Sequence, residues 1–238
     1  MKLLAFDTST DSMAIAVSDG ERVWQHTGPG GAKASSTLIP AILELLGQAG
    51  LPLNQLDALA FGRGPGSFTG LRTACAVAQG LALGAGIPVL PVDTLLAVAE
   101  EARFEAGAPA DLQVTAMLDA RMDEIYVQQF VCNAGQWAAA SACALIRPEN
   151  LALSKDKVLA GNVFAVYASR LPPIPETVQR VTALPTATAL LRLAPALLAR
   201  GESVAAAHAL PLYIRDKVAL TTEERARIKA DAAAVANG

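Results

Sequence analysis

The sequence predicts an α/β protein. Short apolar runs typical of buried strands alternate with longer segments whose apolar residues recur at helical spacing. Hydrophobic residues make up 53% of the 238 residues but aromatic residues only 5%, so the apolar content is largely Ala, Leu and Val, which suits helices packed closely on sheets. This length allows one large domain or two lobes, and either would bury most of the surface of the unfolded chain.

Three antiparallel strands are predicted at the start of the chain. Residues 2–6 are apolar, residues 7–12 are polar and rich in turn formers, and residues 13–17 are apolar again, which indicates a β-hairpin. Asp19-Gly20 is a further hairpin signal, so residues 22–26 are expected to form the third strand. The Gly-Pro-Gly-Gly segment at residues 28–31 then predicts a loop.

A helix is predicted over residues 36–49. Ser35 or Ser36 can cap its N-terminus, and Gly50 can end it. Glu44 is its only charged residue, so its apolar surface is wider than one stripe. The apolar residues that recur at helical spacing are Leu38, Ile42, Leu45, Leu46 and Ala49.

A strand, a helix and a second strand are predicted next. Residues 56–61, which are apolar apart from Asp57, and residues 87–92 read as buried strands, and residues 70–84 read as a helix. This order implies a parallel crossover, which is right-handed by the general rule. Residues 94–103 predict a further helix.

The predicted helix at residues 70–84 has unusually few charged residues. No charged residue occurs from Thr73 through Ile87, whereas a surface helix of a soluble domain normally keeps a polar face. We therefore expect this helix and the helix at 36–49 to form a face that docks a partner protein; burial beneath the chain's own second lobe is the alternative. The expected interface residues are Leu38, Ile42, Leu45, Leu46, Ala49, Leu71, Ala74, Cys75, Ala78, Leu81 and Ala82.

A second lobe is predicted after a linker near residues 105–109. Residues 112–118 and 125–131 read as antiparallel strands joined by a polar turn at 119–124, which repeats the layout of the first hairpin. A helix is expected over 186–200, kinked at Pro195, and a capping box before an Ala-rich run predicts a terminal helix over 223–235. The expected divisions are a first lobe at 1–106, a second lobe at 107–215 and a tail, predicted to be helical, at 216–238.

Composition excludes several classes of protein. A net charge of -3 gives the whole chain no excess positive charge with which to bind a phosphate backbone. The first apolar run is cut by Asp7, too early for a signal-peptide core, and no later stretch resembles a membrane span, so a cytoplasmic protein is expected. The 3 cysteines are widely spaced and are expected to be small core residues, without disulfide or metal cluster.

The glycine-rich segment at 62–72 lies between a strand and a helix, where backbone amides and the helix dipole attract anions. It lacks the Gly-Lys-Ser/Thr ending of a P-loop and the spacing of a dinucleotide fingerprint. The glycines can instead serve only to bring a helix close to its sheet, and this structural interpretation is the favoured one. Its residues considered for either role are Gly64, Gly66, Ser67, Thr69, Gly70 and Arg72, with Ser67 and Thr69 as possible caps.

Two further polar positions are candidates for chemistry. Asp7 and Thr8 at the end of the first strand could hold a metal-bound phosphate, with Asp119 and Arg121 as their counterpart in the second lobe. Asp and Ser/Thr side chains in such turns more often bond their own backbone, which is the favoured interpretation for each site. The 2 histidines are far apart in sequence, so the chain offers no zinc-hydrolase motif.

Four segments together resemble the bacterial TsaB (YeaZ) family. These are LLAFDTST at residues 3–10, GRGPGSFTGLR at 62–72, DARMDEIY at 119–126 and PLYIR at 211–215, and the match runs from Met1 to about Val218. The long glycine motif is the most specific of them. One position departs from the pattern, because Ala34 stands where many relatives have a histidine, and any role of that histidine is absent from this chain.

The resemblance implies a two-lobed fold of the actin, sugar-kinase and Hsp70-ATPase (ASKHA) type, each lobe a mixed sheet flanked by helices. It also implies a non-catalytic subunit required for N6-threonylcarbamoylation of adenosine 37 in tRNAs that read ANN codons. In that family TsaD is the catalytic, metal-binding paralogue and TsaE is an ATPase. The resemblance therefore implies no catalytic residue, metal or cofactor in this chain, ATP or ADP and metal on the partner subunits, contact with tRNA only through the complex, and a homodimer when the chain is alone.

Two other functions are weighed against this scaffold. One is an autonomous ATPase or phosphotransferase that uses Asp7, Thr8 and Asp119; the other is a peptidase, for which the sequence offers no Ser/His or metal arrangement. For the scaffold, a charged residue in place of Leu45 or Ala78 is expected to abolish binding to TsaD and to leave the fold intact.

Overall fold

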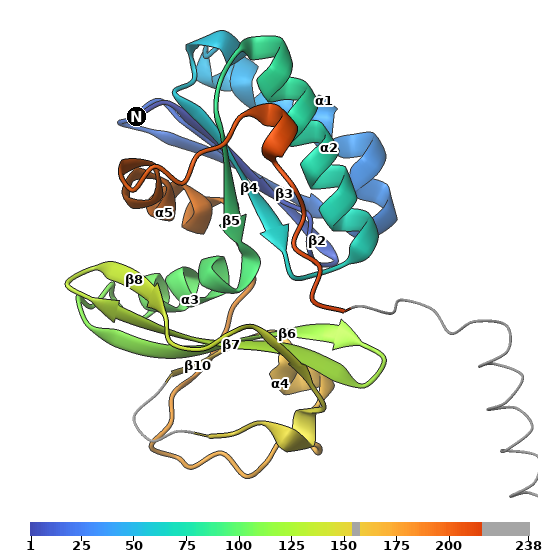
Figure 1. Cartoon of the computed structure of the whole chain (residues 1–238), viewed down its shortest axis with the longest axis vertical. Coiled ribbons are helices and arrows are strands. Elements are labelled where there is room, and N and C mark those ends of the chain that lie inside the picture. Colours follow the sequence, from blue (N-terminus) through green and yellow to red (C-terminus); the bar gives the residue numbers. More distant parts are fainter. Residues whose placement is uncertain (154–157, 216–238) are drawn as a thin grey trace, which may run out of the picture.

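The computed structural model describes residues 1–153 and 158–215, and two mixed β-sheets form its framework (Figure 1). The first sheet has the strand order β3-β2-β1-β4-β5. Its strands are β1 (Leu3–Asp7), β2 (Ser12–Ser18), β3 (Val23–Pro29), β4 (Ala58–Gly64) and β5 (Val89–Asp93). β1, β2 and β3 pair antiparallel, whereas β4 is parallel to both β1 and β5, as the two predicted hairpins and the crossover require.

The second sheet has the order β11-β10-β6-β7-β8, and β9 also pairs with β7. Its strands are β6 (Leu112–Arg121), β7 (Glu124–Asn133), β8 (Gln136–Ala139), β9 (Ala144–Ile146), β10 (Val158–Gly161) and β11 (Arg180–Thr182). The predicted hairpin of β6 and β7 is confirmed, and both strands extend further into the turn than the sequence pattern indicated. These two sheets confirm the expected α/β class and the expected pair of mixed sheets with helices.

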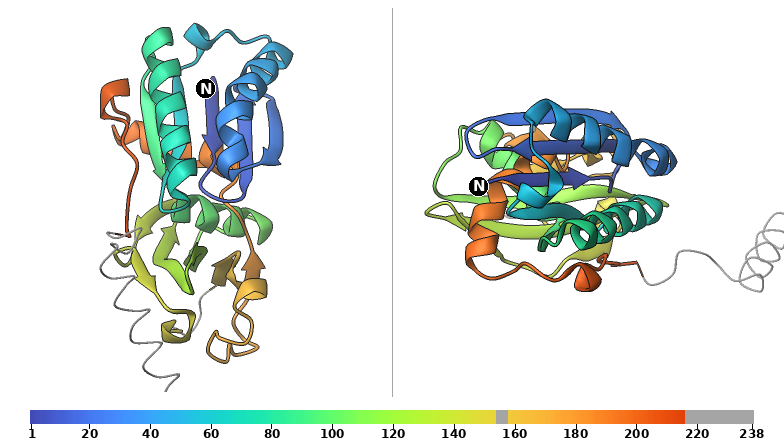
Figure 2. Two further views of the ribbon diagram at one scale, coloured as in Figure 1. Left: turned by 90° about the vertical axis from the view of Figure 1, so that its right-hand side faces the viewer. Right: turned by 90° about the horizontal axis from the view of Figure 1, so that it is seen from above.

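Both faces of the first sheet are covered by helices. These are α1 (Ala34–Ala49) and α2 (Phe68–Ala85) on one face and α3 (Thr94–Glu105) and α5 (Ala187–Ala199) on the other; α4 (Val163–Val166) belongs to the second lobe. Figure 2 shows α1 and α2 side by side on their sheet. In β1 the side chains alternate, so that Leu4 and Phe6 pack under α1 and α2 whereas Leu3 and Ala5 pack toward α3 and α5. This two-sided cover explains why every residue of β1 is buried.

The helix ends differ from the prediction in detail. α1 begins at Ala34, so neither Ser35 nor Ser36 is its N-cap, and the Ser36 hydroxyl donates instead to the Lys33 carbonyl at 3.0 Å. Gly50 does end α1, in the left-handed conformation that only glycine adopts easily. Of the loop expected at 28–31, Gly28 and Pro29 continue the edge strand β3, where proline is tolerated because no partner needs its N–H.

The chain returns to the first lobe before it ends, which corrects the boundary predicted for the second lobe. α5 packs on β1, β2 and β4, and Val204 forms a β-bridge with Val89 of β5. The second lobe therefore ends near β11, before α5, whereas the predicted range was 107–215. The predicted tail at 216–238, with its helix at 223–235, lies outside the described residues.

One hydrophobic core runs through both lobes. It contains residues of β1 and β4, nearly all the buried face of α3, and residues of β6, β7 and β10, so α3 lies between the two sheets (Figure 1). Among the helices of the described ranges, none combines the length and the hydrophobicity needed to cross a membrane. All three cysteines are free thiols, and Cys75 and Cys132 are buried as expected for core residues, whereas Cys143 is partly exposed.

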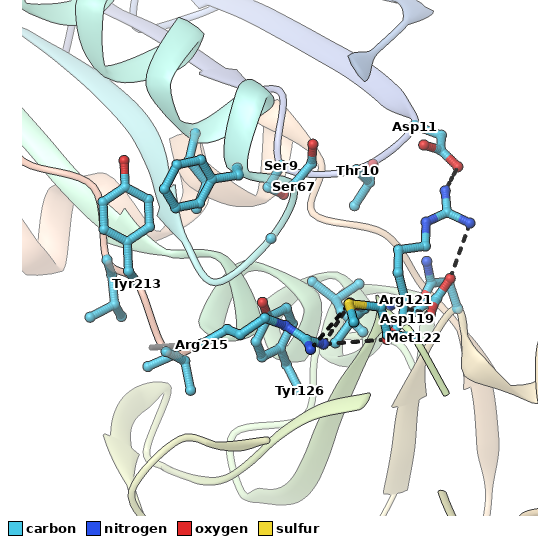
Figure 3. Close-up of a pocket in the computed structure, with 18 residues that line it drawn as sticks. Ser9, Thr10, Asp11, Ser67, Asp119, Arg121, Met122, Tyr126, Tyr213 and Arg215 are labelled. Atoms are coloured by element: carbon cyan, nitrogen blue, oxygen red, sulfur yellow. Dashed lines mark hydrogen bonds and ion pairs between the residues drawn. The ribbon is translucent and has the colours of Figure 1, made fainter. Parts of the chain in front are cut away.

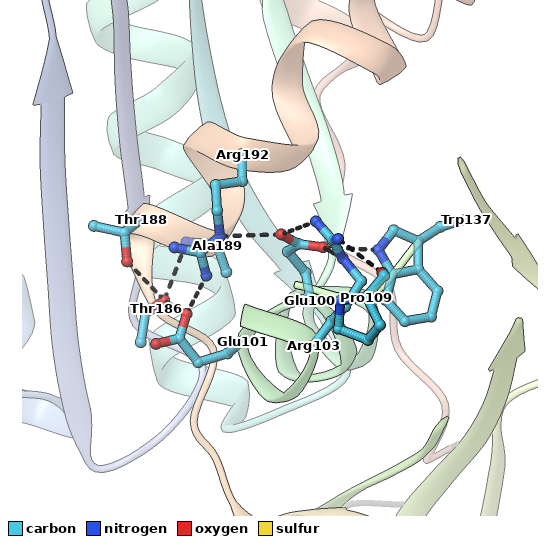
Figure 4. A network of polar contacts seen from close by, with 9 residues as sticks. All are labelled: Glu100, Glu101, Arg103, Pro109, Trp137, Thr186, Thr188, Ala189 and Arg192. Atoms are coloured by element: carbon cyan, nitrogen blue, oxygen red, sulfur yellow. Dashed lines mark hydrogen bonds and ion pairs between the residues drawn. The ribbon is translucent and has the colours of Figure 1, made fainter. Parts of the chain in front are cut away.

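A buried polar cluster, here called the clasp, joins α3, α5 and β8 (Figure 4). Glu100 is only 2% exposed and accepts hydrogen bonds from Arg103 at 2.8 Å, Trp137 at 2.9 Å and Arg192 at 3.0 Å. Burial alone raises the pKa of Glu100, but hydrogen bonds from Arg103 and Trp137 and the charges of Arg103 and Arg192 outweigh it, so the pKa is lowered. The remaining members of the clasp are Glu101, which accepts from Thr186 and Arg192, and Thr186, which caps α5.

We predict that Glu100→Gln lowers the free energy of unfolding by about 2–4 kcal/mol at pH 7, because two guanidinium groups lose their buried counter-charge. Since the pKa of Glu100 is depressed in the folded state, its stabilisation is complete above its ordinary pKa and disappears as the pH falls through the folded-state value. Urea denaturation at pH 7 and at pH 3 measures this, and the deficit of the variant should shrink at the lower pH. Glu202→Gln, which breaks an exposed pair with Arg200, is the control and should change stability by less than about 0.5 kcal/mol.

Candidate functional site

The end of β1 and the first turn of α2 lie in direct contact. The Thr8 hydroxyl donates to the Gly70 carbonyl at 2.8 Å, and the Ser67 amide donates to the Ser9 carbonyl at 2.7 Å. A Cβ atom on Gly70 would overlap the Thr8 carbonyl oxygen, so only glycine fits there. The structure thus supports the structural interpretation of the glycine-rich segment, namely a close entry of a helix onto its sheet.

Asp7 is sealed beneath this segment. It is 1% exposed, and its Oδ1 accepts hydrogen bonds from the Ser9 amide at 2.8 Å and the Ser9 hydroxyl at 2.6 Å. Its Oδ2 has no hydrogen-bond partner in the described structure, and a Cβ on Gly62 would overlap it. Burial raises the pKa of Asp7 to about 6, against a smaller lowering by the hydrogen bonds from Ser9.

A pocket of about 260 Å³ lies between the lobes (Figure 3). Ser9, Thr10 and Asp11 line it from the first lobe, and Asp119 and Arg121 line it from the second. The N-terminal end of α2 and residues 212–215 complete the wall. The sequence named candidates in the glycine-rich segment and at the ends of two strands. Of these, Gly66, Ser67, Asp119 and Arg121 line the pocket. The others lie outside its lining: Asp7, Thr8, Gly64, Thr69, Gly70 and Arg72.

The arginines at this pocket are already paired. Arg121 forms an ion pair with Asp11 and lies 3.4 Å from Asp119, and Arg215 pairs with Glu124 at 2.7 Å. Asp119 in turn accepts a hydrogen bond from the Tyr167 hydroxyl at 2.8 Å. Each positive charge is thus balanced by a carboxylate of the protein, which leaves little net attraction for a phosphate group.

This geometry agrees with the favoured interpretation of Asp7 and Asp119, since each accepts a hydrogen bond from a backbone amide two residues further on, and it does not support the alternative of a metal-bound phosphate between them. Asp7 and Thr8 are buried, Asp7 bonded to Ser9 of its own loop and Thr8 to Gly70 of α2, and neither lines the pocket. In the ranges that the structure describes, no three His, Cys, Asp or Glu residues lie close enough to hold a metal ion. Ser67 is the N-cap residue of α2, but its side chain makes no capping hydrogen bond, which corrects the expectation of a possible cap.

The residues expected to form the partner interface are mostly in the core. All but Ala49 and Leu81 are buried. Leu71 lines the pocket between the lobes, and the other buried residues pack α1 and α2 onto their own sheet: Leu38, Ile42, Leu45, Leu46, Ala74, Cys75, Ala78 and Ala82. A charge at Leu45 or Ala78 would be placed in this core, so the expected loss of binding with an intact fold does not apply to those positions.

The opposite sides of the same two helices carry exposed apolar residues, which on α1 lie beside the exposed polar residues Glu44 and Gln48. Ile39 and Leu43 of α1 are 43% and 51% exposed, and Leu83 of α2 is 78% exposed. Gly80 and Gly84 of α2 are exposed too, with open space where a Cβ would be. We call these five residues the outer face. Ile39 and Leu43 are four positions apart, and Gly80 lies three positions before Leu83 and four before Gly84, which is helical spacing. The signal is weaker in the sequence than the buried stripes because two of the five residues are glycine.

Charge is nearly absent from these helices. Glu44 in α1 and Arg72 in α2 are their only charged residues, and Arg72 lies at the start of α2 with its guanidinium 4.0 Å from the centre of the Phe68 ring. Shallow hollows adjoin the outer face, one beside Leu43 and Gly47 and another beside Gly80 and Gly84. The outer face is therefore an uncharged surface with room for the side chains of another protein.

Comparison with known proteins places this architecture among relatives. A family model described as TsaD, tRNA N6-adenosine threonylcarbamoyltransferase, matches residues 28–234. Proteins named tRNA threonylcarbamoyladenosine biosynthesis protein TsaB, from Escherichia coli and Haemophilus influenzae, are 34% and 36% identical, each over 92% of this chain and 96% and 95% of their own length. A solved structure of YeaZ from Pseudomonas aeruginosa is 39% identical, covers 89% of this chain and 99% of its own, and superposes with a TM-score of 0.80.

We predict that Asp7→Asn changes the pH dependence of stability. The pKa of Asp7 rises from 3.8 to about 6 on folding, so the folded chain binds the Asp7 proton more tightly than the unfolded chain does. The free energy of unfolding of the wild type therefore falls by up to about 3 kcal/mol as the pH rises through this range. Asparagine cannot ionise, so the stability of the variant relative to wild type should increase by a similar amount between pH 4 and pH 7.5. Urea denaturation across this range tests it, with the exposed Asp57→Asn as the control, and parallel curves for Asp7→Asn and wild type would contradict the assignment.

Proposed function

Because the chain belongs to the TsaB (YeaZ) family, we propose that it acts in the biosynthesis of threonylcarbamoyladenosine in tRNA, the process for which its curated relatives are named. We propose further that it is a non-catalytic subunit of the machinery that modifies N6 of adenosine 37 in tRNAs reading ANN codons. In this role it binds and supports the catalytic paralogue TsaD, and the ATPase TsaE joins the pair. Nucleotide and metal are then held by the partner subunits.

The single observation that carries this proposal is the uncharged outer face of α1 and α2. A large apolar side chain such as Leu83, at 78% exposure, gains about 1.5–3 kcal/mol when a partner covers it completely. Glycines at positions 80 and 84 let the backbone of a partner helix approach α2 closely. In the absence of TsaD, the same face would favour a homodimer of this chain.

Two other features favour a non-catalytic role. Asp7 and Thr8 are occupied by bonds within the fold, so the chemistry that these positions could offer a nucleotide is blocked. A net charge of -3 favours contact with tRNA through the complex rather than through this chain alone. We place the protein in the cytoplasm, where tRNA is modified.

An autonomous ATPase or phosphotransferase is the second candidate, favoured only by the pocket between the lobes. Titration of the isolated chain with ATP and magnesium in a calorimeter distinguishes it, because micromolar binding with turnover would support an ATPase and displace the scaffold. We expect no such binding, since the arginines of the pocket are paired with Asp11, Asp119 and Glu124. A peptidase is tested by incubating purified TsaD with this chain, and we expect TsaD to stay intact.

We predict that Leu83→Glu weakens binding to TsaD at least about 100-fold, because the partner would have to desolvate a carboxylate in an apolar contact. Leu83 is largely exposed, so the melting temperature should stay within a few degrees of wild type. Calorimetry with the purified partner measures the affinity. Val166→Glu, on the second lobe and 58% exposed, is the matched control and should bind normally.

Ala78→Glu tests the buried side of the same helix. Ala78 faces the core beneath α2, so a charge there should prevent stable folding. Normal affinity of Leu83→Glu for TsaD would refute the outer face as the docking site. In bacteria depleted of their own TsaB, wild-type chain and Val166→Glu should restore threonylcarbamoyladenosine in tRNA, as measured by mass spectrometry of nucleosides, and Leu83→Glu should not.

A further inference from the structure

The segment at residues 203–215, here called the strap, runs from the first lobe to the second along the flank of α2 (Figure 1). Its beginning is fixed to β5, because Val204 and Val89 exchange backbone hydrogen bonds of 2.7 and 3.0 Å. Its middle is fixed to α2, because the Ala209 carbonyl accepts hydrogen bonds from Cys75 Sγ at 3.0 Å and Gln79 Nε2 at 2.8 Å. The strap is therefore a firm part of the first lobe up to this point.

Near its end the strap crosses the junction between the lobes. The Leu212 amide donates to the Arg63 carbonyl at 2.7 Å, and the Tyr213 ring stacks on Phe68 with centroids 4.5 Å apart, so both residues still bind the first lobe. Two residues later, Arg215 binds the second lobe. Its guanidinium pairs with Glu124 at 2.7 Å and donates to the Ala120 carbonyl at 3.1 Å, at the turn between β6 and β7.

These contacts of Arg215 are well shielded. The side chain is 14% exposed and that of Glu124 is 30% exposed, so the ion pair is less screened by water than a surface pair. A guanidinium that binds one carboxylate and a main-chain carbonyl at once also restricts the direction of approach, which a single ion pair does not. Arg215 thus holds the β6–β7 turn at one distance and one angle from the strap.

The clasp joins the lobes at a different place. Glu100 and Arg192 connect α3 with α5, and Trp137 of β8 brings in the second sheet. In Figure 1, α5 and β8 lie on the left, whereas the strap reaches the second lobe to their right, so the two connections are separated across the junction. The ion pair between Asp11 and Arg121 and the hydrophobic core around α3 also cross the junction. The clasp and Arg215 add two shielded polar connections at separated points, which together restrict rotation more than either one alone.

We propose that Arg215 is a latch which, together with the clasp, holds the two lobes at a fixed angle and keeps the pocket between them at constant width. Without the latch, the exposed ion pair between Asp11 and Arg121 is a weak remaining polar tie between the β6–β7 turn and the first lobe. The turn then moves away from residues 212–215, which line the same pocket as Asp119 and Arg121. This proposal does not rest on the proposed function, because it concerns the motion of the isolated chain. It assigns to Arg215 a conformational role that binding to a partner does not require.

Hydrogen–deuterium exchange of the full chain tests the latch. In Arg215→Ala, amides of the β6–β7 turn and of residues 210–215 should exchange about tenfold faster or more, because they open without global unfolding. Amides of β1 and β4 should keep their wild-type rates. Arg200→Ala, which removes an exposed arginine that pairs with Glu202, is the matched control and should leave the turn unchanged.

A second measurement separates the latch from a general loss of stability. The double variant Arg192→Ala, Arg215→Ala should show a larger radius of gyration in small-angle scattering than either single variant, since both connections are released. If Arg215→Ala accelerates exchange everywhere, Glu124→Gln, which keeps Arg215 and its carbonyl bonds, should still accelerate exchange at the turn alone. Unchanged exchange at the turn in Arg215→Ala, uniform acceleration in both single variants, or an unchanged radius of gyration in the double variant would each overturn the proposal.

Discussion

The contact between the end of β1 and the first turn of α2 is the constraint on which the rest of the first lobe depends. The main chain of Thr8 lies so close to Gly70 that no other residue fits at that position, and the Thr8 hydroxyl bonds the carbonyl of the same glycine. α2 is thereby held at one height and one rotation on its sheet. Because a helix has a fixed angular spacing, that rotation decides which side chains enter the core and which remain outside.

The same contact determines the chemistry that the site offers. A strand that ends in Asp-Thr-Ser beside a glycine-rich loop has the residue types of a phosphate site, yet here the loop lies directly over the carboxylate. Ser9 satisfies one oxygen of Asp7, and the raised pKa reflects the cost of keeping a carboxylate away from water. Residues that could have bound a ligand instead hold the loop in place, which agrees with a supporting subunit better than with an autonomous enzyme.

Much of the fold could be predicted from periodicity alone. The strands of the first sheet and the hairpin of β6 and β7 follow from long or alternating apolar runs, and α1, α2, α3 and α5 from helical spacing. The short strands β8 to β11 and α4 could not, because elements of three or four residues carry too few positions to show a period. The return of α5 to the first sheet was also missed, since an apolar helix has no local mark of which sheet it covers.

The interface shows a more particular limit of sequence reasoning. In α2, Ala78 and Leu83 are both apolar, and only the rotation set by the Thr8–Gly70 contact places the first in the core and the second outside. Hydrophobicity therefore selected the sides of these helices that pack in the core, whereas the proposed docking residues lie on the other sides. The informative signal was the absence of charge over Thr73 to Ile87, because a helix needs only one apolar side to pack on its sheet. The second uncharged side of α2 has no explanation within the described fold of this chain, and it is the observation behind the proposed docking of a partner.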